Sequence, residues 1–278
     1  MNGLRSRRRT FGAYAVLVSL AVLFLIPLLW TILYALRPSS ERNAVPISII
    51  PSRLDFSNFR RALTTIDFFH FLKNSLVLSI IYTTLVTLSS ALVGFAFARL
   101  KAPGRRHLFT LVLATMMVPA IITIIPTYVL FSRIGLLGNY WPWVFWGLSG
   151  SPLMIFLFRQ FFAAVPQELE EAALLDGVGY GRMFVSIFLP LARPVIAACV
   201  VITFTYSWGE FFAPAIFLPP EKTTLAVAIA RGYVDKQGRT LPNVLAAGVV
   251  FYVLPIVVLF AFAQRMFVRG LMSSGIKG

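Results

Sequence analysis

Six apolar runs, separated by polar segments, constrain the fold of this 278-residue chain more than any other feature. A bilayer core about 30 Å thick needs about 20 apolar residues per helix. The runs that reach this length are residues 12–36, 74–98, 108–131, 141–162, 195–218 and 245–263. The chain is 58% hydrophobic and 13% charged, whereas soluble domains carry about 25% charged residues. The sequence therefore predicts an all-α integral membrane protein with six transmembrane helices.

The distribution of Lys and Arg predicts the orientation of these helices. The net charge of +15 would suit a nucleic-acid-binding protein, but the bases lie mostly in loops and tails between the apolar runs. Such charge near span ends is the usual topology signal, with the excess on the cytosolic side. The two densest clusters, residues 5–9 and 99–106, contain no acid. We therefore expect both termini in the cytosol, as an N-terminal tail (1–11) and a C-terminal tail (265–278) around a transmembrane domain (12–264).

Residues 163–194 form the longest polar-rich loop on the predicted cytosolic side. Pro166 suits the first turn of a helix, where its missing N–H costs nothing. Four of the ten acids follow within nine residues, and those in the first turn complement the helix dipole. They are Glu168, Glu170, Glu171 and Asp176. Gly177 supplies a C-terminal stop. The pattern predicts a short helix over 166–176 and a second one over 182–189, presented to a soluble partner.

The fifth run is interrupted by polar and aromatic side chains. Glu210 is the only acid well inside a predicted span, and burying it costs about 3 kcal/mol, so it should face a cavity or a donor. Aromatic rings beside hydrogen-bonding groups suit a polyhydroxylated ligand. The candidate substrate path consists of Thr203, Tyr206, Ser207, Trp208, Glu210 and Phe211. The alternative is a structural carboxylate satisfied by neighbouring helices.

Proline and tryptophan mark further features of the spans. Pro119 and Pro126 lie in the third run and Pro255 lies in the last. Each removes a helix hydrogen bond, so these helices either line a path or carry packing kinks. Three tryptophans open the fourth run, where an aromatic belt at the membrane surface is expected. They are Trp141, Trp143 and Trp146.

The 163–194 loop also carries a spaced motif. It fits the pattern EAA-x3-G-x9-I-x-LP without a gap. Glu171-Ala172-Ala173 is followed after three residues by Gly177, after nine more by Ile187, and after one more by Leu189-Pro190. This motif resembles the coupling loop of the membrane subunits of ATP-binding-cassette importers. Residues 116–141, 159–177 and 264–278 resemble the maltose-type branch, which imports oligosaccharides and related polyols. The segment 208–214 resembles that branch's Trp-Asn-Glu-Phe segment, with Gly209 in place of Asn.

The resemblance implies residues and partners that the composition alone does not show. The short helix would sit in a cleft of a cytosolic ATPase and convey its closure to the spans. The coupling residues would be Glu168, Glu171, Ala172, Ala173, Asp176, Gly177, Ile187, Leu189 and Pro190. The implied partners are a second homologous permease subunit, two ATPase subunits, membrane lipid and an extracytoplasmic substrate-binding protein. That last protein would meet the outer segments 37–70 and 219–244, at a bacterial or archaeal plasma membrane.

Several kinds of chemistry are not supported by the sequence. A G-x4-GK[ST] phosphate loop does not occur, so we expect no cofactor in this chain, and ATP and Mg on the partner ATPase. The single Cys199 and the separated His70 and His107 predict neither an intrachain disulfide nor a histidine metal site. We find no His/Asp/Glu constellation for an intramembrane enzyme, and we expect no nucleic-acid partner.

The expected function is that of a permease subunit in an ATP-driven, binding-protein-dependent importer of a di- or oligosaccharide, working by alternating access. An importer of a polyol phosphate such as glycerol 3-phosphate is the alternative. An ion-coupled secondary transporter is more distant, because it would need internal repeats or paired intramembrane charges, and Glu210 has no evident partner in the spans.

Overall fold

The structure is a computed structural model that describes residues 2–41 and 50–274, with side chains described for 12–41 and 50–264. Residue 1, part of the predicted outer segment (42–49) and the end of the predicted C-terminal tail (275–278) lie outside the described residues. The described residues are helical apart from connecting turns and one isolated bridge, Val234 to Thr240. The prediction of an all-α membrane protein is confirmed.

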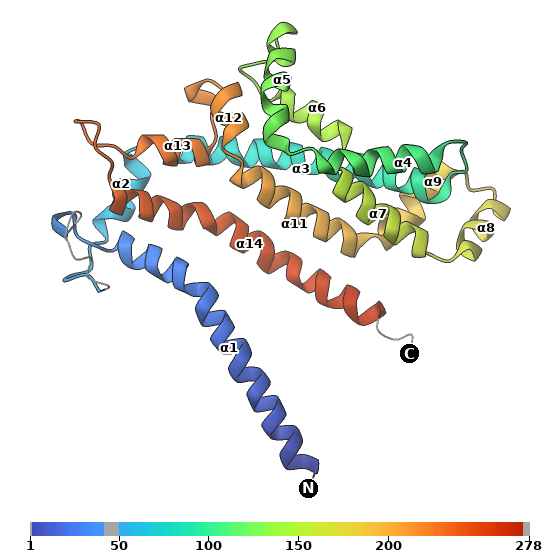
Figure 1. Ribbon diagram of the computed structural model, residues 1–278, viewed down its shortest axis with the longest axis horizontal. Helices are drawn as coiled ribbons and strands as arrows, with labels where there is room; N and C mark the ends of the chain where they lie inside the picture. Colours follow the sequence, from blue (N-terminus) through green and yellow to red (C-terminus); the bar gives the residue numbers. More distant parts are fainter. Residues whose placement is uncertain (1, 42–49, 275–278) are drawn as a thin grey trace. The chain divides into compact units, whose positions relative to one another are not determined.

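Three long helices and two short ones account for four of the predicted spans. The long helices are α1 (Asn2–Ala35), α3 (Phe68–Arg99) and α14 (Pro242–Ser274), which continues through Pro255 (Figure 1). The short ones, α6 (Trp141–Ser149) and α7 (Pro152–Ala164), together form one candidate span. By length and apolar composition, four helices of the described chain can cross a membrane. The number rises to six if each of two bent helix pairs is one span.

The predicted third span is broken rather than continuous. It consists of α4 (Arg105–Ala114), a 3₁₀ turn (Thr115–Met117) and α5 (Ala120–Arg133), and the bend between its halves is 100°. Pro119 causes the break, because a residue before proline avoids the helical conformation, and Val118 is extended with ψ 114°. Pro126, by contrast, lies within α5 without ending it.

The predicted fifth span also needs correction. The helix over this run is α11 (Arg193–Gly209), and it ends at Gly209 instead of continuing to residue 218. A separate six-residue helix, α12 (Phe212–Phe217), follows after Glu210, whose backbone is extended. Glu210 therefore lies in a helix break and not in the middle of a straight span.

The chain divides into two compact units, each described here by itself. The first comprises Met1–Phe69 and Ala228–Leu254. Within it, the buried Asn58 of α2 (Ser57–Thr64) donates to the backbone oxygens of Ala35 and Arg37 at 2.9 and 2.8 Å. These bonds satisfy carbonyls left without a helical partner at the end of α1. The end of α1 and α2 are thereby fixed together.

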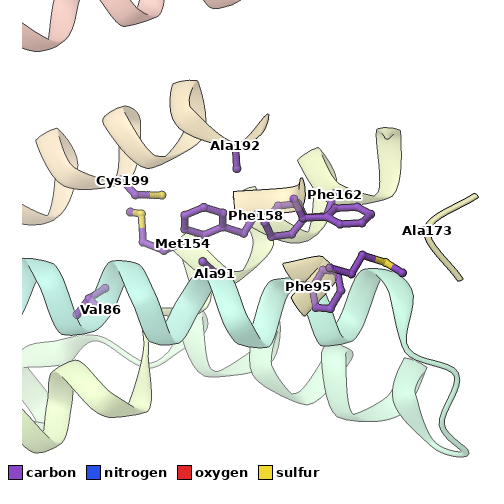
Figure 2. Packing of buried hydrophobic residues seen from close by; sticks show 11 residues of the cluster. Val86, Ala91, Phe95, Met154, Phe158, Phe162, Ala173, Ala192 and Cys199 are labelled. Carbon is purple, nitrogen blue, oxygen red and sulfur yellow. The ribbon is translucent and has the colours of Figure 1, made fainter. Parts of the chain in front are cut away.

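The second unit comprises His70–Val227 and Pro255–Gly278 and holds an aromatic core. Figure 2 shows Phe95 of α3 near Phe158 and Phe162 of α7, with Cys199 of α11 at the other side of the cluster. Gly94 allows the close approach of α3 and α7, because a Cβ there would lie 2.6 Å from Phe158 Cβ. Small residues at helix interfaces in membranes allow such close packing. Residues of the 163–194 loop, including Ala173, Met183 and Phe188, pack into this core, which therefore supports the loop.

Candidate functional site

The predicted cytosolic helix is present as α8 (Gln167–Leu175). Pro166 is the residue before its first turn, with an extended ψ of 142°, and Asp176 is its C-cap. The helix is therefore slightly shorter than the predicted 166–176. Glu168 and Glu170 lie in the first turn, where carboxylates are favourable to the helix dipole. In Figure 1, α8 lies beyond the end of α7, whereas α12 lies toward the opposite end of α3.

Gly177 ends α8 as predicted. Its φ is +74°, in the left-handed region that glycine adopts without steric cost. The Gly177 N–H donates to Leu174 O at 3.0 Å and the Val178 N–H donates to Ala173 O at 2.9 Å. This pair of bonds is the Schellman motif, which satisfies carbonyls at a helix end. The turn that positions α8 is thus set by one residue.

The predicted coupling residues divide into two groups by exposure. Glu168, Glu171, Ala172, Asp176, Gly177 and Pro190 are exposed. Ala173 is buried, and Ile187 and Leu189 pack against the same aromatic core. The first group is therefore available to a partner, whereas the second attaches the loop to the unit. Leu175 is 88% exposed and extends the exposed face, since it lies four residues after Glu171.

The second short helix of the loop is longer than the predicted 182–189. It begins as α9 (Tyr180–Met183), widens into a π-helical turn (Phe184–Phe188) and ends as α10 (Leu189–Leu191). The Leu189 N–H donates to Phe184 O, five residues earlier. Such π turns occur where a helix departs from regular geometry. The loop then enters α11 through a bend of 78°.

Arg99 joins α8 to the rest of the unit, although sequence reasoning treated it only as one of a basic cluster. It is 7% exposed at the end of α3. Its Nε and Nη2 donate to Phe162 O at 3.1 and 2.6 Å, and Nη2 also donates to Val165 O. Its Nη1 lies 3.1 Å from Glu170 Oε2, and its Cζ lies 5.0 Å from the Phe188 ring centroid. One guanidinium therefore links α3, the end of α7 and α8.

A cavity of about 740 Å³ lies in the second unit, where three helix breaks meet. Ala120 lines it at the start of α5, Gly150 between α6 and α7, and Gly209 at the end of α11. At membrane depth, irregular backbone is tolerated where it is buried in protein or lines a cavity. Discontinuous helices of this kind form the binding sites of many transporters. This cavity is the candidate substrate path.

Four of the six predicted substrate-path residues line this cavity: Tyr206, Ser207, Glu210 and Phe211. Thr203 lines a smaller cavity of about 340 Å³, which Tyr206 also lines. Trp208 lines neither; it is 1% exposed and stacks on Phe204 with ring centroids 5.5 Å apart. Its role in the described structure is packing.

Glu210 combines the two roles that the sequence left open. Its Oε1 accepts the Ala213 N–H at 3.0 Å, so part of the carboxylate is structural. Its Oε2 and the Ser207 Oγ are buried, and neither atom has a hydrogen-bond partner within the described residues. Buried polar atoms normally have a partner. Because Glu210 and Ser207 both line the cavity, these two unpartnered atoms are suited to form hydrogen bonds with a bound ligand.

Several cavity residues were not identified from the sequence as ligand candidates. They are Tyr82, Thr123, Thr127, Trp143, Trp146 and Ser149. Trp143 is 3% exposed, and Trp146 packs on the same apolar cluster of the second unit. The buried Trp143 does not fit the expected membrane-surface belt, whereas Trp141, which is 53% exposed, fits it. Within the described residues, His, Cys, Asp and Glu form no cluster suited to a metal.

Comparison with known proteins agrees with this architecture. The chain is 34% identical over 263 residues to the arabinooligosaccharides transport system permease protein AraQ of Halalkalibacterium halodurans, covering 93% of both chains. It is 31% identical to the maltodextrin transport system permease protein MdxG of Bacillus subtilis, covering 95% of both. A crystal structure of a bacterial ABC transporter involved in alginate import contains a chain of similar fold. The TM-score is 0.79 at 21% identity, over 95% of this chain and 98% of that one.

The family description "Binding-protein-dependent transport system inner membrane component" matches residues 90–273. That range contains α8, Gly177 and the breaks of the third and fifth spans. The chain therefore belongs to the family of binding-protein-dependent transport system inner membrane components, the multi-pass permease subunits of ABC transporters.

Proposed function

We propose that this chain is the permease subunit of an ATP-driven importer of a di- or oligosaccharide. The observation that carries the proposal is α8, which presents exposed acids outside the aromatic core and is fixed to it by Arg99. Oligosaccharides in particular are suggested by the names of the relatives AraQ and MdxG. A polyol phosphate is less well supported, since neither of these names contains one.

The proposed mechanism starts at α8. Closure of two partner ATPases around ATP and Mg would displace α8 together with its exposed residues Glu168, Glu171 and Asp176. Arg99 would transmit this displacement to α3 and α7, because it is hydrogen-bonded to the end of α7 and ion-paired to Glu170. Tyr82 of α3 and the Gly150 break before α7 line the cavity, so movement of these helices would change its access. The ligand itself biases the two states only through its differential affinity.

The remaining partners follow from the same proposal. A second homologous permease subunit would complete the translocation path, and an extracytoplasmic substrate-binding protein would deliver the ligand. The family description names dependence on a binding protein and therefore supports the proposed substrate-binding protein. Both termini and α8 would lie in the cytosol, on the side where the basic clusters of residues 5–9 and 99–106 are expected. ATP would be hydrolysed by the partners and not by this chain.

The proposal is tested with the assembled transporter. This chain, its companion permease and the ATPase would be copurified, reconstituted in proteoliposomes and supplied with the binding protein. We expect one or more di- or oligosaccharides from a sugar and polyol panel to stimulate ATP hydrolysis and to accumulate inside. Stimulation by a polyol phosphate and by none of the sugars would refute the proposed substrate class. Uptake driven by an ion gradient without ATP would refute the importer class.

A further inference from the structure

The cavity wall has an unusual balance of charge. Among the described residues that line it, Glu210 is the only one with a formal charge, and the wall includes no Lys, Arg or His. An anionic ligand that leaves water needs an ion pair or strong donors to offset its lost hydration. This wall offers it no cation. The nearest charge in the wall would instead repel it.

The backbone donor beside Glu210 is also already used. A free N–H at a helix break can hold an anion, but the Ala213 N–H donates to Glu210 Oε1 at 3.0 Å. The start of α5, at Ala120, lies at the same cavity. The start of α7, after Gly150, also lies there, as do the ends of α6 and α11. Each helix start contributes a partial positive charge of about one half and each helix end an equal negative one, so these four contributions cancel. The carboxylate of Glu210 therefore leaves the cavity net negative.

The uncharged part of the wall suits a neutral saccharide. Rings of Trp146, Tyr206 and Phe211 provide apolar faces, and the hydroxyls of Thr123, Thr127 and Ser207 provide hydrogen-bonding groups. Thr123 and Thr127 donate to backbone oxygens of their own helix, which leaves their oxygens as acceptors. Ser207 Oγ is unpartnered within the described residues. Apolar walls with a few polar groups are typical of ligand sites.

We propose that this cavity binds uncharged saccharides and excludes anionic ones, with Glu210 as the residue that determines this selectivity. The inference rests on the proposed sugar import and adds the charge class of the sugar. It predicts that the cavity does not bind anionic ligands such as uronates or polyol phosphates. The alginate transporter of similar fold is described as importing an acidic polysaccharide, so the shared fold does not itself set the charge class.

The test measures binding in the complete transporter, without the binding protein. Tryptophan fluorescence in nanodiscs would be titrated with neutral trisaccharides (arabinotriose, galactotriose and maltotriose) and with trigalacturonate, at equal ionic strength. We expect at least one neutral trisaccharide to quench the fluorescence at a concentration about tenfold or more below that needed for trigalacturonate. The reason is that the Glu210 carboxylate repels the anionic sugar and not the neutral one. In Glu210→Gln the ratio of these two concentrations should fall to about twofold or less, because the negative charge is removed. The amide oxygen of Gln still accepts the Ala213 N–H, so the local structure is kept.

A second variant locates the signal. The double variant Trp143→Phe/Trp146→Phe keeps aromatic rings at the cavity and should remove most of the quenching, because both tryptophans that line the cavity are replaced. The inference is overturned if wild type binds trigalacturonate as tightly as the neutral sugars, if no trisaccharide quenches, or if Glu210→Gln leaves the difference unchanged. Quenching that survives the double variant Trp143→Phe/Trp146→Phe also overturns it, because both tryptophans that line the cavity are then absent and the site would lie elsewhere. Uptake in proteoliposomes with the binding protein is scored separately, and its failure for every sugar would refute the proposed function instead.

Discussion

At the scale of single residues, Arg99 shows how one buried charge can hold a functional segment. A buried guanidinium is stable only if its donors are satisfied. Arg99 achieves this with backbone oxygens of Phe162 and Val165 and with the Glu170 carboxylate. Its place in the last turn of α3 is favourable as well, since cations there complement the helix dipole.

We predict that Arg99→Gln weakens the attachment of α8 and reduces ATP-driven uptake strongly. Removing one partner of a buried pair typically costs about 3–5 kcal/mol. Glu170→Gln should reduce uptake less, because Arg99 keeps its bonds to Phe162 and Val165. Uptake and thermal unfolding of the reconstituted complex would be measured for both, with the exposed Arg106→Gln as the matched control. A larger defect in Glu170→Gln than in Arg99→Gln would contradict this arrangement.

Glu171 tests the exposed face of α8. It is exposed, so Glu171→Lys should leave the folding of the subunit unchanged, within about 0.5 kcal/mol as for most surface substitutions. If α8 docks on an ATPase through its acids, the reversed charge should nevertheless abolish uptake. Uptake and the amount of copurifying ATPase are the measurements. Normal values of both would show that Glu171 does not take part in docking.

At the scale of elements, the ends of helices determine the candidate sites more than their middles. α8 exists as a separate helix because Gly177 stops it and Pro166 precedes it. The cavity exists where α5, α7 and α11 begin or end. Pro119 breaks the third span because the residue before it, Val118, is held extended. Gly150 separates α6 from α7 because it adopts a positive φ of +73°.

Gly177 provides a test at this scale. Gly177→Pro removes the N–H that donates to Leu174 O and cannot adopt the φ of +74°. We predict loss of uptake with the subunit still in the membrane. Gly177→Ala should be milder, at about 1–2 kcal/mol for the left-handed conformation, because its Cβ would meet open space. Gly179→Ala is the matched control, since Gly179 has an ordinary φ of −71°. Normal uptake by Gly177→Pro would refute the role of this turn.

At the scale of the whole molecule, the proposed orientation can be tested directly. In a Cys199→Ala background, we predict that a membrane-impermeant maleimide added outside labels Gln237→Cys but not Lys101→Cys. Both positions are exposed, and the proposed topology places them on opposite sides of the membrane. Permeabilised cells, in which both should react, are the control. Labelling of Lys101→Cys from outside would reverse the proposed orientation.

The membrane class, the approximate spans and the α8 helix with its stop at Gly177 can all be predicted from the sequence. These features depend on residues close together in the chain: runs of apolar side chains, a proline, a glycine and carboxylates in one turn. The sequence predicts a break or a kink at Pro119, but it does not predict the helix end at Gly209, which lies inside the predicted fifth span. Proline and glycine permit a break or a kink, and surrounding packing selects between them, as the unbroken helix at Pro126 shows.

The combinations of residues that act together become visible in the folded protein. Arg99 bonds to Phe162 and Glu170 across 63 and 71 positions of sequence. Tyr82 of α3, Trp146 of α6 and Glu210, between α11 and α12, line one cavity. Ala173, a member of the spaced motif, proved to be buried and to pack into the core. Local propensity acts over a few residues, whereas these contacts depend on how helices pack against one another, and periodicity along one helix does not specify its neighbour.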